Sequence, residues 1–366
     1  MSRDGTRRIR RQRPVRSRGQ TASRRRGGLR ASPTSREVAE LAGVSRSAVS
    51  RTFTPDASVS ERTRRKVLDA AAKLGYQPDV IARSLITRRS RLVGLIMGEW
   101  DNPFYTTMLR GFSEKLQGRD YQVILLTRGP DGGVDGAVRL LLQYRVDGIV
   151  LVSCEPGAAV ARDCERAGVR LVLVNREAGA LRAASIVADS IRIGRDVADL
   201  LLRGGYERLA IVRGDPSLPT GIVRTRAFKA AVAASKRARV LIDQTGVLGY
   251  AAGRRFVIEA MKGEPRPDAI FCSSDLTAIG VLDGARLDLG IAVPEALAVV
   301  GFGDGPAAAL GAYDLTTVRL PVERLIDASI EALLSEQAPD PARPVVVEAG
   351  IVQRATVRLV RVPSRG

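Results

Sequence analysis

The side chains best suited to chemistry in this chain of 366 residues are arginines concentrated in its first quarter. Residues 1–30 carry twelve Arg and one Asp, a net charge of +11. Residues 31–90 carry eleven Lys and Arg against six acidic residues, a net of +5, so that only +3 of the total of +19 falls on the rest. Charge gathered in this way predicts a polyanionic partner, and nucleic acid is the first expectation. A merely solvated charge run is the alternative.

The residue types that most often carry enzymatic and metal chemistry are scarce. The sequence has no His, which rules out a His-based catalytic triad. Its three cysteines, Cys154, Cys164 and Cys272, show no CxxC spacing and leave a zinc or iron site almost without ligands. We therefore predict no catalytic residue, no metal and no cofactor. Cys154 and Cys272 lie in or at the end of apolar runs and are expected to be small buried residues.

The elements that position the arginines of residues 34–77 begin with a short helix. Thr34 and Glu37 form a capping box, in which a hydroxyl and a carboxylate satisfy amide donors that the start of a helix leaves open. Gly43 is expected to end this helix, because glycine adopts a left-handed backbone without strain. The apolar face between these two points is expected to consist of Val38, Ala39, Leu41 and Ala42.

Two further helices complete the predicted domain. Ser45 is a natural N-cap for a helix over roughly Arg46–Phe53. Ser60 caps a third helix, which is expected to place Val67, Leu68, Ala71 and Leu74 on one face. A helix, a tight turn containing glycine and a second helix form a helix-turn-helix, whose second helix enters the major groove with its N-terminal residues against base edges. A plain helical hairpin with a polar outer face is the alternative.

The same stretch resembles the lactose-repressor and galactose-repressor (LacI/GalR) family, and the resemblance runs from about Thr34 to about Arg358. The family string DVAxxAGVSxxTVSR appears here as EVAELAGVSRSAVSR, and VSxxTRxKVxxAAxxLGYxPN appears as VSERTRRKVLDAAAKLGYQPD. The resemblance implies that Arg46, Ser47 and Arg51 contact bases. The full set of DNA-binding residues expected in this domain is Thr34, Ser45, Arg46, Ser47, Ser50, Arg51, Ser60 and Tyr76.

Residues 78–90 are expected to form a hinge helix and linker. The resemblance implies that Ala82 and Leu85 lie on a short helix in the minor groove, where a Leu pair from two chains wedges between bases and kinks the duplex. Asp79 departs from the family, which usually has Asn at this position, and a carboxylate is less favourable near phosphates.

Residues 1–30 are expected to form a disordered, Arg-rich arm, because they have almost no apolar residue and no periodicity. The arm would add phosphate contacts that strengthen binding without reading sequence. A translated stretch upstream of the true start codon explains it equally well. No apolar run follows the arginines, as a secretory signal would require, and no run of ~18 apolar residues occurs anywhere. A cytoplasmic protein is expected, one that joins the bacterial nucleoid when bound to DNA.

From residue 91 onward, short apolar runs alternate with amphipathic stretches. The expected strands lack polar alternation, as strands covered on both faces do, and are Leu92–Met97, Gln122–Leu126, Gly148–Val152, Leu171–Val174, Leu209–Val212, Ala269–Cys272 and Leu297–Gly301. The expected helices lie near 104–118, 135–144, 158–167, 190–203, 222–235, 249–262, 275–289 and 322–335. This alternation predicts an α/β region of parallel sheets with crossover helices, long enough for two subdomains.

The family fold implied is an all-α helix-turn-helix headpiece (residues 31–77) followed by a core like the type I periplasmic binding proteins (residues 91–366). In that fold two subdomains are joined by three chain crossings, expected near Ala188–Ile191, near Leu315–Arg319 and after Pro344. The N-subdomain is expected to include about 91–189 and 319–344, and the C-subdomain about 190–316 and 345–360. A small molecule would bind between them, at the ends of the strands.

Effector contacts are carried over from the resemblance position by position. WDNPFY at 100–105 matches an NPFY turn at the mouth of the cleft, and Arg224 matches an arginine that clamps hydroxyls or carboxylates. VVGFGDGP matches VVGFDDIP, so that Gly303 replaces an Asp that often binds sugar hydroxyls, while Ser274 replaces an Asn. Both departures argue against a simple sugar. The expected effector-binding residues are Asn102, Phe104, Asn175, Arg176, Arg224, Ser274, Asp275 and Asp304; helix capping or turn formation is the alternative role for each.

The predicted function is that of a sequence-specific transcriptional regulator, with repression favoured. A homodimer would bind a pseudo-palindromic double-stranded operator under allosteric control by a small molecule, a sugar or related metabolite. The resemblance implies a central CG step between the half-sites. Release and recruitment by the effector both fit the sequence. Two alternatives remain: a cytoplasmic α/β sugar-binding or sugar-modifying protein with a basic tail, and a non-specific nucleoid-type DNA-binding protein.

Overall fold

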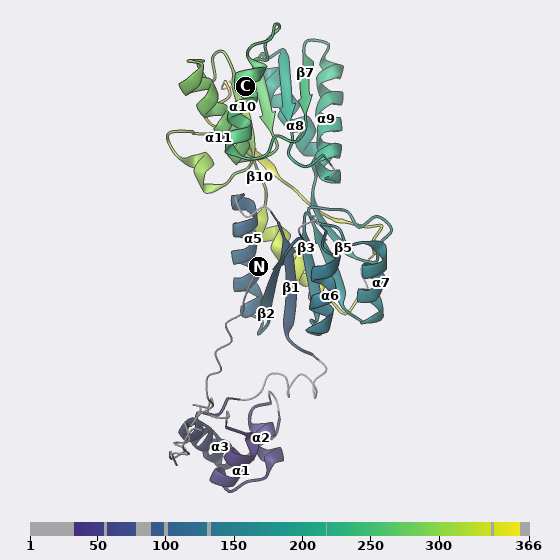
Figure 1. Cartoon of the computed structure of the whole chain (residues 1–366), viewed down its shortest axis with the longest axis vertical. Coiled ribbons are helices and arrows are strands. Elements are labelled where there is room, and N and C mark those ends of the chain that lie inside the picture. Colours follow the sequence, from purple (N-terminus) through teal and green to yellow (C-terminus); the bar gives the residue numbers. More distant parts are fainter. Residues whose placement is uncertain are drawn as a thin grey trace, which may run out of the picture. The chain divides into compact units, whose positions relative to one another are not determined.

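The computed structural model describes residues 33–54, 57–77, 89–98, 102–129, 133–216, 218–337 and 340–358. The chain divides into two compact units, residues 1–82 and 83–366 (Figure 1). The expected arm of residues 1–30 and most of the expected hinge, including Asp79, Ala82 and Leu85, lie outside the described residues.

The described residues of the first unit form three helices, α1 (Ser35–Ala42), α2 (Arg46–Thr52) and α3 (Glu61–Leu74). The capping box is present: the amide of Thr34 donates to Glu37 at 2.6 Å, and the amide of Glu37 donates to the hydroxyl of Thr34 at 3.4 Å. Gly43 ends α1 in the left-handed conformation, as predicted. The core of this unit is formed by Val38, Ala39, Ala42, Val49, Val67, Ala70 and Ala71.

Two leucines do not lie where the sequence predicted. Leu41 and Leu68 were expected in the core, but they are 53% and 46% exposed. An α-helix turns by about 100° per residue, so each side chain is rotated roughly a quarter turn away from the buried positions of its helix. Buried alanines form much of the core instead, and their small side chains let the three helices approach closely.

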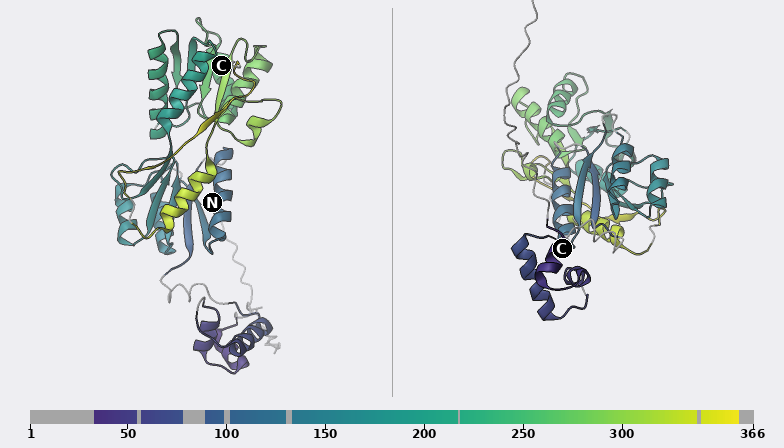
Figure 2. Two further views of the ribbon diagram at one scale, coloured as in Figure 1. Left: turned by 180° about the vertical axis from the view of Figure 1, so that it is seen from behind. Right: turned by 60° about the horizontal axis from the view of Figure 1, so that its bottom comes forward.

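The second unit contains two six-stranded sheets, and the first has the strand order β11-β5-β4-β3-β1-β2 with all strands parallel. Helices α5 (Pro103–Gln117) and α12 (Val322–Leu334) cover one face of it, and α6 (Asp135–Gln143) and α7 (Ala158–Arg166) cover the other (Figure 2). Its strands are β1 (Leu92–Met97), β2 (Gln122–Thr127), β3 (Gly148–Val152), β4 (Arg170–Val174), β5 (Ala184–Ala188) and β11 (Val345–Val347).

The second sheet has the order β12-β10-β9-β8-β6-β7, with only the β10–β12 pair antiparallel. Helices α8 (Ser190–Arg203) and α9 (Pro219–Ser235) pack on one face. Helices α10 (Tyr250–Ala260) and α11 (Asp275–Asp283), which continues into the π-helical turn η1 (Gly284–Asp288), pack on the other. Its strands are β6 (Arg208–Val212), β7 (Arg239–Gln244), β8 (Ala269–Cys272), β9 (Ala298–Gly303), β10 (Thr317–Arg319) and β12 (Gly350–Val352).

Within the described residues the chain passes between the sheets three times, after β5, after β10 and between β11 and β12. Two boundaries differ from the expected ones. Val345–Val347 were expected in the second subdomain, but they pair with β5 of the first, because this apolar run extends the open edge of that sheet. Arg319 was expected in the first subdomain, but β10 pairs with β9, so the crossing follows at Leu320–Pro321.

Cys154, Cys164 and Cys272 are buried and unbridged, which confirms the expectation for Cys154 and Cys272. Burial raises the pKa of the Cys164 thiol to about 11, which makes it unreactive near neutral pH. Among the described residues, no helix has the length and apolar character needed to cross a bilayer.

Candidate DNA-binding surface and effector cleft

Helix α2 presents one polar side to solvent and one apolar side to the core of the first unit. Val49 and Thr52 are buried, and the guanidinium of Arg64 on α3 donates to the carbonyl of Thr52 at 3.2 Å. These contacts fix the orientation of the helix. The polar side chains left exposed at its start and along its outer side are Ser45, Arg46, Ser47, Ser50 and Arg51. An exposed set of donors on one side of a helix can reach base edges in a major groove.

Three other predicted DNA-binding residues have structural roles in the same unit. The hydroxyls of Thr34 and Ser60 accept the capping hydrogen bonds of α1 and α3, and both residues stay exposed. The ring of Tyr76 packs against that of Phe53, with centroids 5.9 Å apart, and is half-buried. Ala82 and Leu85 lie outside the described residues.

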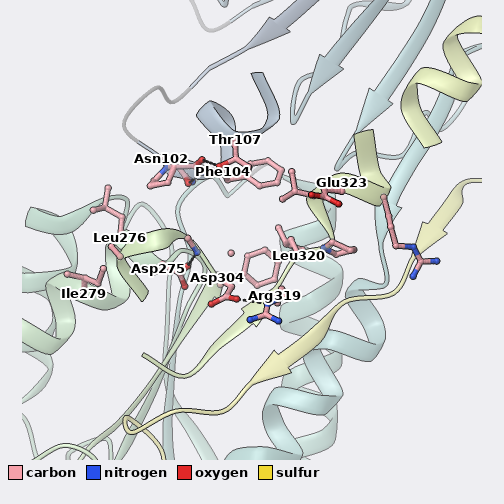
Figure 3. Close-up of a pocket in the computed structure, with 18 residues that line it drawn as sticks. Asn102, Phe104, Thr107, Asp275, Leu276, Ile279, Asp304, Arg319, Leu320 and Glu323 are labelled. Carbon is pink, nitrogen blue, oxygen red and sulfur yellow. Dashed lines mark hydrogen bonds and ion pairs between the residues drawn. The ribbon is translucent and has the colours of Figure 1, made fainter. Parts of the chain in front are cut away.

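The cleft of the second unit holds two adjoining cavities. The larger, of about 450 Å³, lies between the start of α5 on one side and the start of α11 and the end of β9 on the other (Figure 3). The smaller, of about 80 Å³, lies deeper along α9. The residues that line both cavities are Asn102, Phe104, Phe302, Gly303 and Leu320.

Asn102 and Phe104 lie at this cleft, as predicted. The side chain of Asn102 accepts a hydrogen bond from the amide of Phe104 at 3.0 Å and so caps α5. The ring of Phe104 packs edge-on against Tyr105 at 5.2 Å and touches the apolar cores of both subdomains. Asn102 thus serves the cap and Phe104 gives the cleft an apolar wall.

Asp275, at the start of α11, lines the larger cavity, but both of its carboxylate oxygens are engaged. One accepts from the hydroxyl of Thr317 at 2.5 Å and the other from the amide of Gly305 at 2.7 Å. Burial raises the pKa of this carboxyl group despite these hydrogen bonds. Asp275 therefore ties α11 to β10 and to the loop after β9.

The carboxylate of Asp304 is also engaged within the protein. It pairs with Arg319 at 2.5 Å and with Arg354 at 2.7 Å (Figure 3 shows the first pair). Burial opposes ionisation, but the hydrogen bonds from the two arginines outweigh it and lower the pKa of Asp304. The carboxylate joins the loop after β9 to the end of β10 and to the segment that follows β12.

Ser274 and Asn175 line the smaller cavity. The hydroxyl of Ser274 caps α11 by accepting from the amide of Thr277 at 3.2 Å. Asn175, in a left-handed conformation directly after β4, donates from its side-chain amide to the hydroxyl of Ser153 at 3.1 Å. Arg176 lines neither of these cavities: it pairs with Glu155 and lines a neighbouring cavity of about 470 Å³.

Arg224 on α9 lies at the smaller cavity and is only 6% exposed. Its guanidinium lies over the ring of Phe302, 3.9 Å from the centroid. Burial, together with the charge of Arg213, lowers the pKa of Arg224 to about 10, so it stays protonated near neutral pH.

Two lining arginines were missed by the sequence analysis. Arg128 and Arg213 each follow the carboxyl end of a parallel strand, β2 and β6, and both reach the smaller cavity. The rule that ligands bind beyond the carboxyl ends of parallel strands would have selected them, because both follow strands that the sequence predicted.

Comparisons with known proteins agree with this architecture. Residues 34–79 match the bacterial regulatory proteins of the lacI family, and residues 198–357 match the periplasmic binding protein-like domain. The chain is 32% identical over 302 residues to the HTH-type transcriptional regulator CelR of Thermobifida fusca, a match that covers 80% of this chain and 88% of that protein. This chain belongs to the LacI family.

Two further members of the same family are similar over most of their length. The ribose operon repressor of Escherichia coli K12 is 29% identical over 307 residues, covering 82% of this chain and 92% of the repressor. The structure of the lac repressor dimer bound to operator and the anti-inducer ONPF aligns with a TM-score of 0.77 at 21% identity, covering 88% of this chain and 98% of that one. The predicted fold class, a helix-turn-helix headpiece followed by a periplasmic-binding-protein-like core, is confirmed.

Proposed function

We propose that this LacI-family protein represses transcription by binding a pseudo-palindromic operator as a homodimer. The observation that carries the proposal is the exposed polar side of α2, where Arg46, Ser47 and Arg51 stand clear of the headpiece core. Two such helices, one from each chain, would enter successive major grooves and read the two half-sites. The ribose operon repressor, a relative of similar length, supports repression over activation.

The arginines of α2 would read bases, and the rest of the basic first quarter would bind phosphates. Thr34, Ser60 and Tyr76 border the helices and would hold the headpiece on the DNA backbone. Ala82 and Leu85 would dock a hinge helix in the minor groove at a central CG step.

Control would come from a small molecule in the cleft between the two sheets. Each of the three chain crossings permits a change in the angle between subdomains, and a ligand held by Phe104 on one side and Arg224 on the other would favour a closed arrangement. The ligand can shift DNA affinity only by its differential affinity for the two arrangements, typically ~1–3 kcal/mol. Action on DNA implies a cytoplasmic protein, bound to the nucleoid when it occupies its operator, that catalyses no reaction.

The experiment that tests this function is fluorescence anisotropy on DNA from upstream of the protein's own gene, near 0.15 M salt, with excess random competitor. We expect binding that survives the competitor, with one dimer per palindrome. Binding that the competitor removes from every fragment tested across the genome would indicate a non-specific DNA-binding protein instead. Turnover of a sugar by the purified protein would support the enzymatic alternative.

A further inference from the structure

The smaller cavity of the cleft is rich in positive charge. Arg128 reaches it from the end of β2, Arg213 from the end of β6 and Arg224 from α9. Among the described residues that line it, the only carboxylate is that of Asp215. Three guanidinium groups thus line a cavity with one carboxylate, and the burial of Arg213 and Arg224 means that solvent screens their charges less than at the surface.

Arg224 is the least satisfied of these groups. It is more than nine-tenths buried, and it makes no hydrogen bond or ion pair with any residue that the structure describes. Its contact with Phe302 is a cation–π interaction, which stabilises the charge but leaves the N–H donors of the guanidinium without an acceptor among the described residues. A buried charge without a hydrogen-bonding partner is destabilising, so an acceptor from outside the chain would stabilise this position.

Arg213 adds a second unused donor. One terminal nitrogen of its guanidinium pairs with Asp243 at 3.0 Å, but its buried Nε has no partner. Its charge also acts on Arg224, where it contributes to the lowered pKa. An anion near both arginines would supply acceptors to the two side chains and cancel their mutual repulsion. Arg128 differs, since it already donates to the carbonyl of Ser153 at 2.8 Å.

Two carboxylates of the cleft that could accept from a neutral sugar are already engaged within the protein. Sugar hydroxyls donate well to carboxylates, but those of Asp275 and Asp304 are engaged within the protein. Gly303, between Phe302 and Asp304 in the chain, has no side chain to offer. Glu323 lines the larger cavity but not the smaller one, where Arg213 and Arg224 lie. The smaller cavity therefore presents more guanidinium groups than carboxylates, which favours a ligand whose own acceptors are charged.

We propose that the effector carries an anionic group, a carboxylate or a phosphate on a small hydroxylated body, and that this group binds Arg213 and Arg224. The inference rests on the proposed function, since it concerns the effector of the same cleft. The body of the ligand would extend into the larger cavity along Phe104 and Leu320, which line both spaces. The two arginines then distinguish an acid or a phosphate ester from the parent sugar, because only the charged forms supply the acceptor.

The decisive test uses inorganic phosphate as the probe and compares thermal unfolding of the full-length wild type with R224M at constant ionic strength. Met keeps an unbranched stem beside Phe302 and removes the guanidinium, with its charge and its N–H donors. At a phosphate concentration tenfold above its Kd, linkage predicts a rise in the wild-type Tm of roughly 3 °C. R224M should lose this rise, whereas R139M, which changes an exposed arginine of α6, should keep it. Phosphate bound by the headpiece contributes equally to all three proteins.

Equal responses of the wild type and R224M, including no response in either, would overturn the proposal. R213Q provides a second variant in case R224M fails to fold. We expect R213Q to bind phosphate at least threefold more weakly than the wild type does. Glucose, glucuronate and glucose 6-phosphate then distinguish the source of the charge: tighter binding of glucuronate identifies a carboxylate and tighter binding of glucose 6-phosphate a phosphate. Tighter binding of glucose than of both would also overturn the proposal.

Operator binding is measured separately, with no anion added beyond the buffer chloride. R139M should bind operator as the wild type does, because Arg139 lines neither cavity of the cleft and lies outside the headpiece. If the wild type responds to phosphate through Arg224 but binds no operator, the proposed function is rejected and the anion site is retained. A wild type that binds operator but shows no Arg224-dependent response would reject only the anion site.

Discussion

The carboxylate of Asp147 accepts two hydrogen bonds from Ser90, from its amide at 2.8 Å and from its hydroxyl at 2.9 Å. The second carboxylate oxygen accepts from the amide of Arg91 at 3.1 Å. Ser90 and Arg91 immediately precede β1, whereas Asp147 immediately precedes β3. The side chain of Asp147 thus holds the two residues directly before β1 against the start of β3.

We expect D147A to lower the stability of the core and to loosen this attachment. Removing the carboxylate leaves three donors without their acceptor, and we expect a loss of about 2 kcal/mol in the free energy of unfolding. The measurement is thermal unfolding by calorimetry. The matched control is D120N, which removes the charge of an 85% exposed carboxylate that also contacts Arg91. Asn tolerates the left-handed backbone of this position, so the change in stability should be less than about 0.5 kcal/mol. Equal effects of the two substitutions would contradict the role given to Asp147.

The ion pairs of Asp304 with Arg319 and Arg354 should stabilise the fold at neutral pH but not in acid. The pKa of Asp304 is lowered in the folded protein, so the stabilisation is present above the ordinary Asp pKa of about 3.9 and is lost as the pH falls through the lowered value. D304N should therefore have a lower Tm than the wild type at pH 7, and the difference should shrink below about pH 4. Calorimetric scans between pH 7 and pH 3 measure it. D327N, which removes an exposed partner of Lys115, serves as the control and should follow the wild type throughout.

For a base-reading residue, we expect R46A to weaken operator binding by about 1–3 kcal/mol, roughly 5- to 150-fold, and binding to random DNA much less. The reason is that a guanidinium in the major groove forms its base-specific hydrogen bonds only on the correct sequence. Anisotropy titrations on both DNAs measure the two effects. R36A is the matched control, since Arg36 is an exposed arginine of α1 paired with Glu40. Weakening of equal size on both DNAs would instead show that Arg46 binds a phosphate.

The parts of this fold that the sequence predicted share a local cause. The caps at Thr34, Ser45 and Ser60 depend on residues within three positions of one another, and each is present. Central strands such as β1 and β3 are buried on both faces and read as unbroken apolar runs. β7 was missed because an edge strand carries polar residues, here Arg239, Asp243 and Gln244, that hide its character.

The site was less predictable, because its chemistry depends on contacts between distant positions. The resemblance suggested Asp304 as an effector ligand, but its partner Arg354 lies 50 positions further along the chain, and no local pattern reveals that pair. Asp275 is likewise engaged by Thr317, 42 positions away. Arg213 could have been selected from its place after a predicted strand, but the sequence does not show that the assembled cleft brings it to the same cavity as Arg224.

Residues 1–30 offer a prediction about salt. Their twelve arginines and single acidic residue can bind phosphates only, so deleting them should lower affinity for all DNA and flatten the dependence of log Kd on log salt. Each phosphate that the deleted segment would have neutralised should account for roughly 0.9 of that slope on double-stranded DNA. Titrations at several salt concentrations, with and without residues 1–30, measure it. An unchanged slope would mean that this segment takes no part in binding.

Leu85 provides the test of the proposed minor-groove contact. If a Leu pair wedges between bases at the centre of the operator, then L85A should weaken operator binding far more than binding to random DNA, because the wedge acts only when two hinge helices dock on one bent site. The operator should also be less bent, which resonance energy transfer between its labelled ends measures. V345A, which alters an exposed side chain of an edge strand in the core, serves as the control and should leave both readings unchanged. Equal weakening on operator and random DNA, with the bend retained, would show that Leu85 does not act as a wedge.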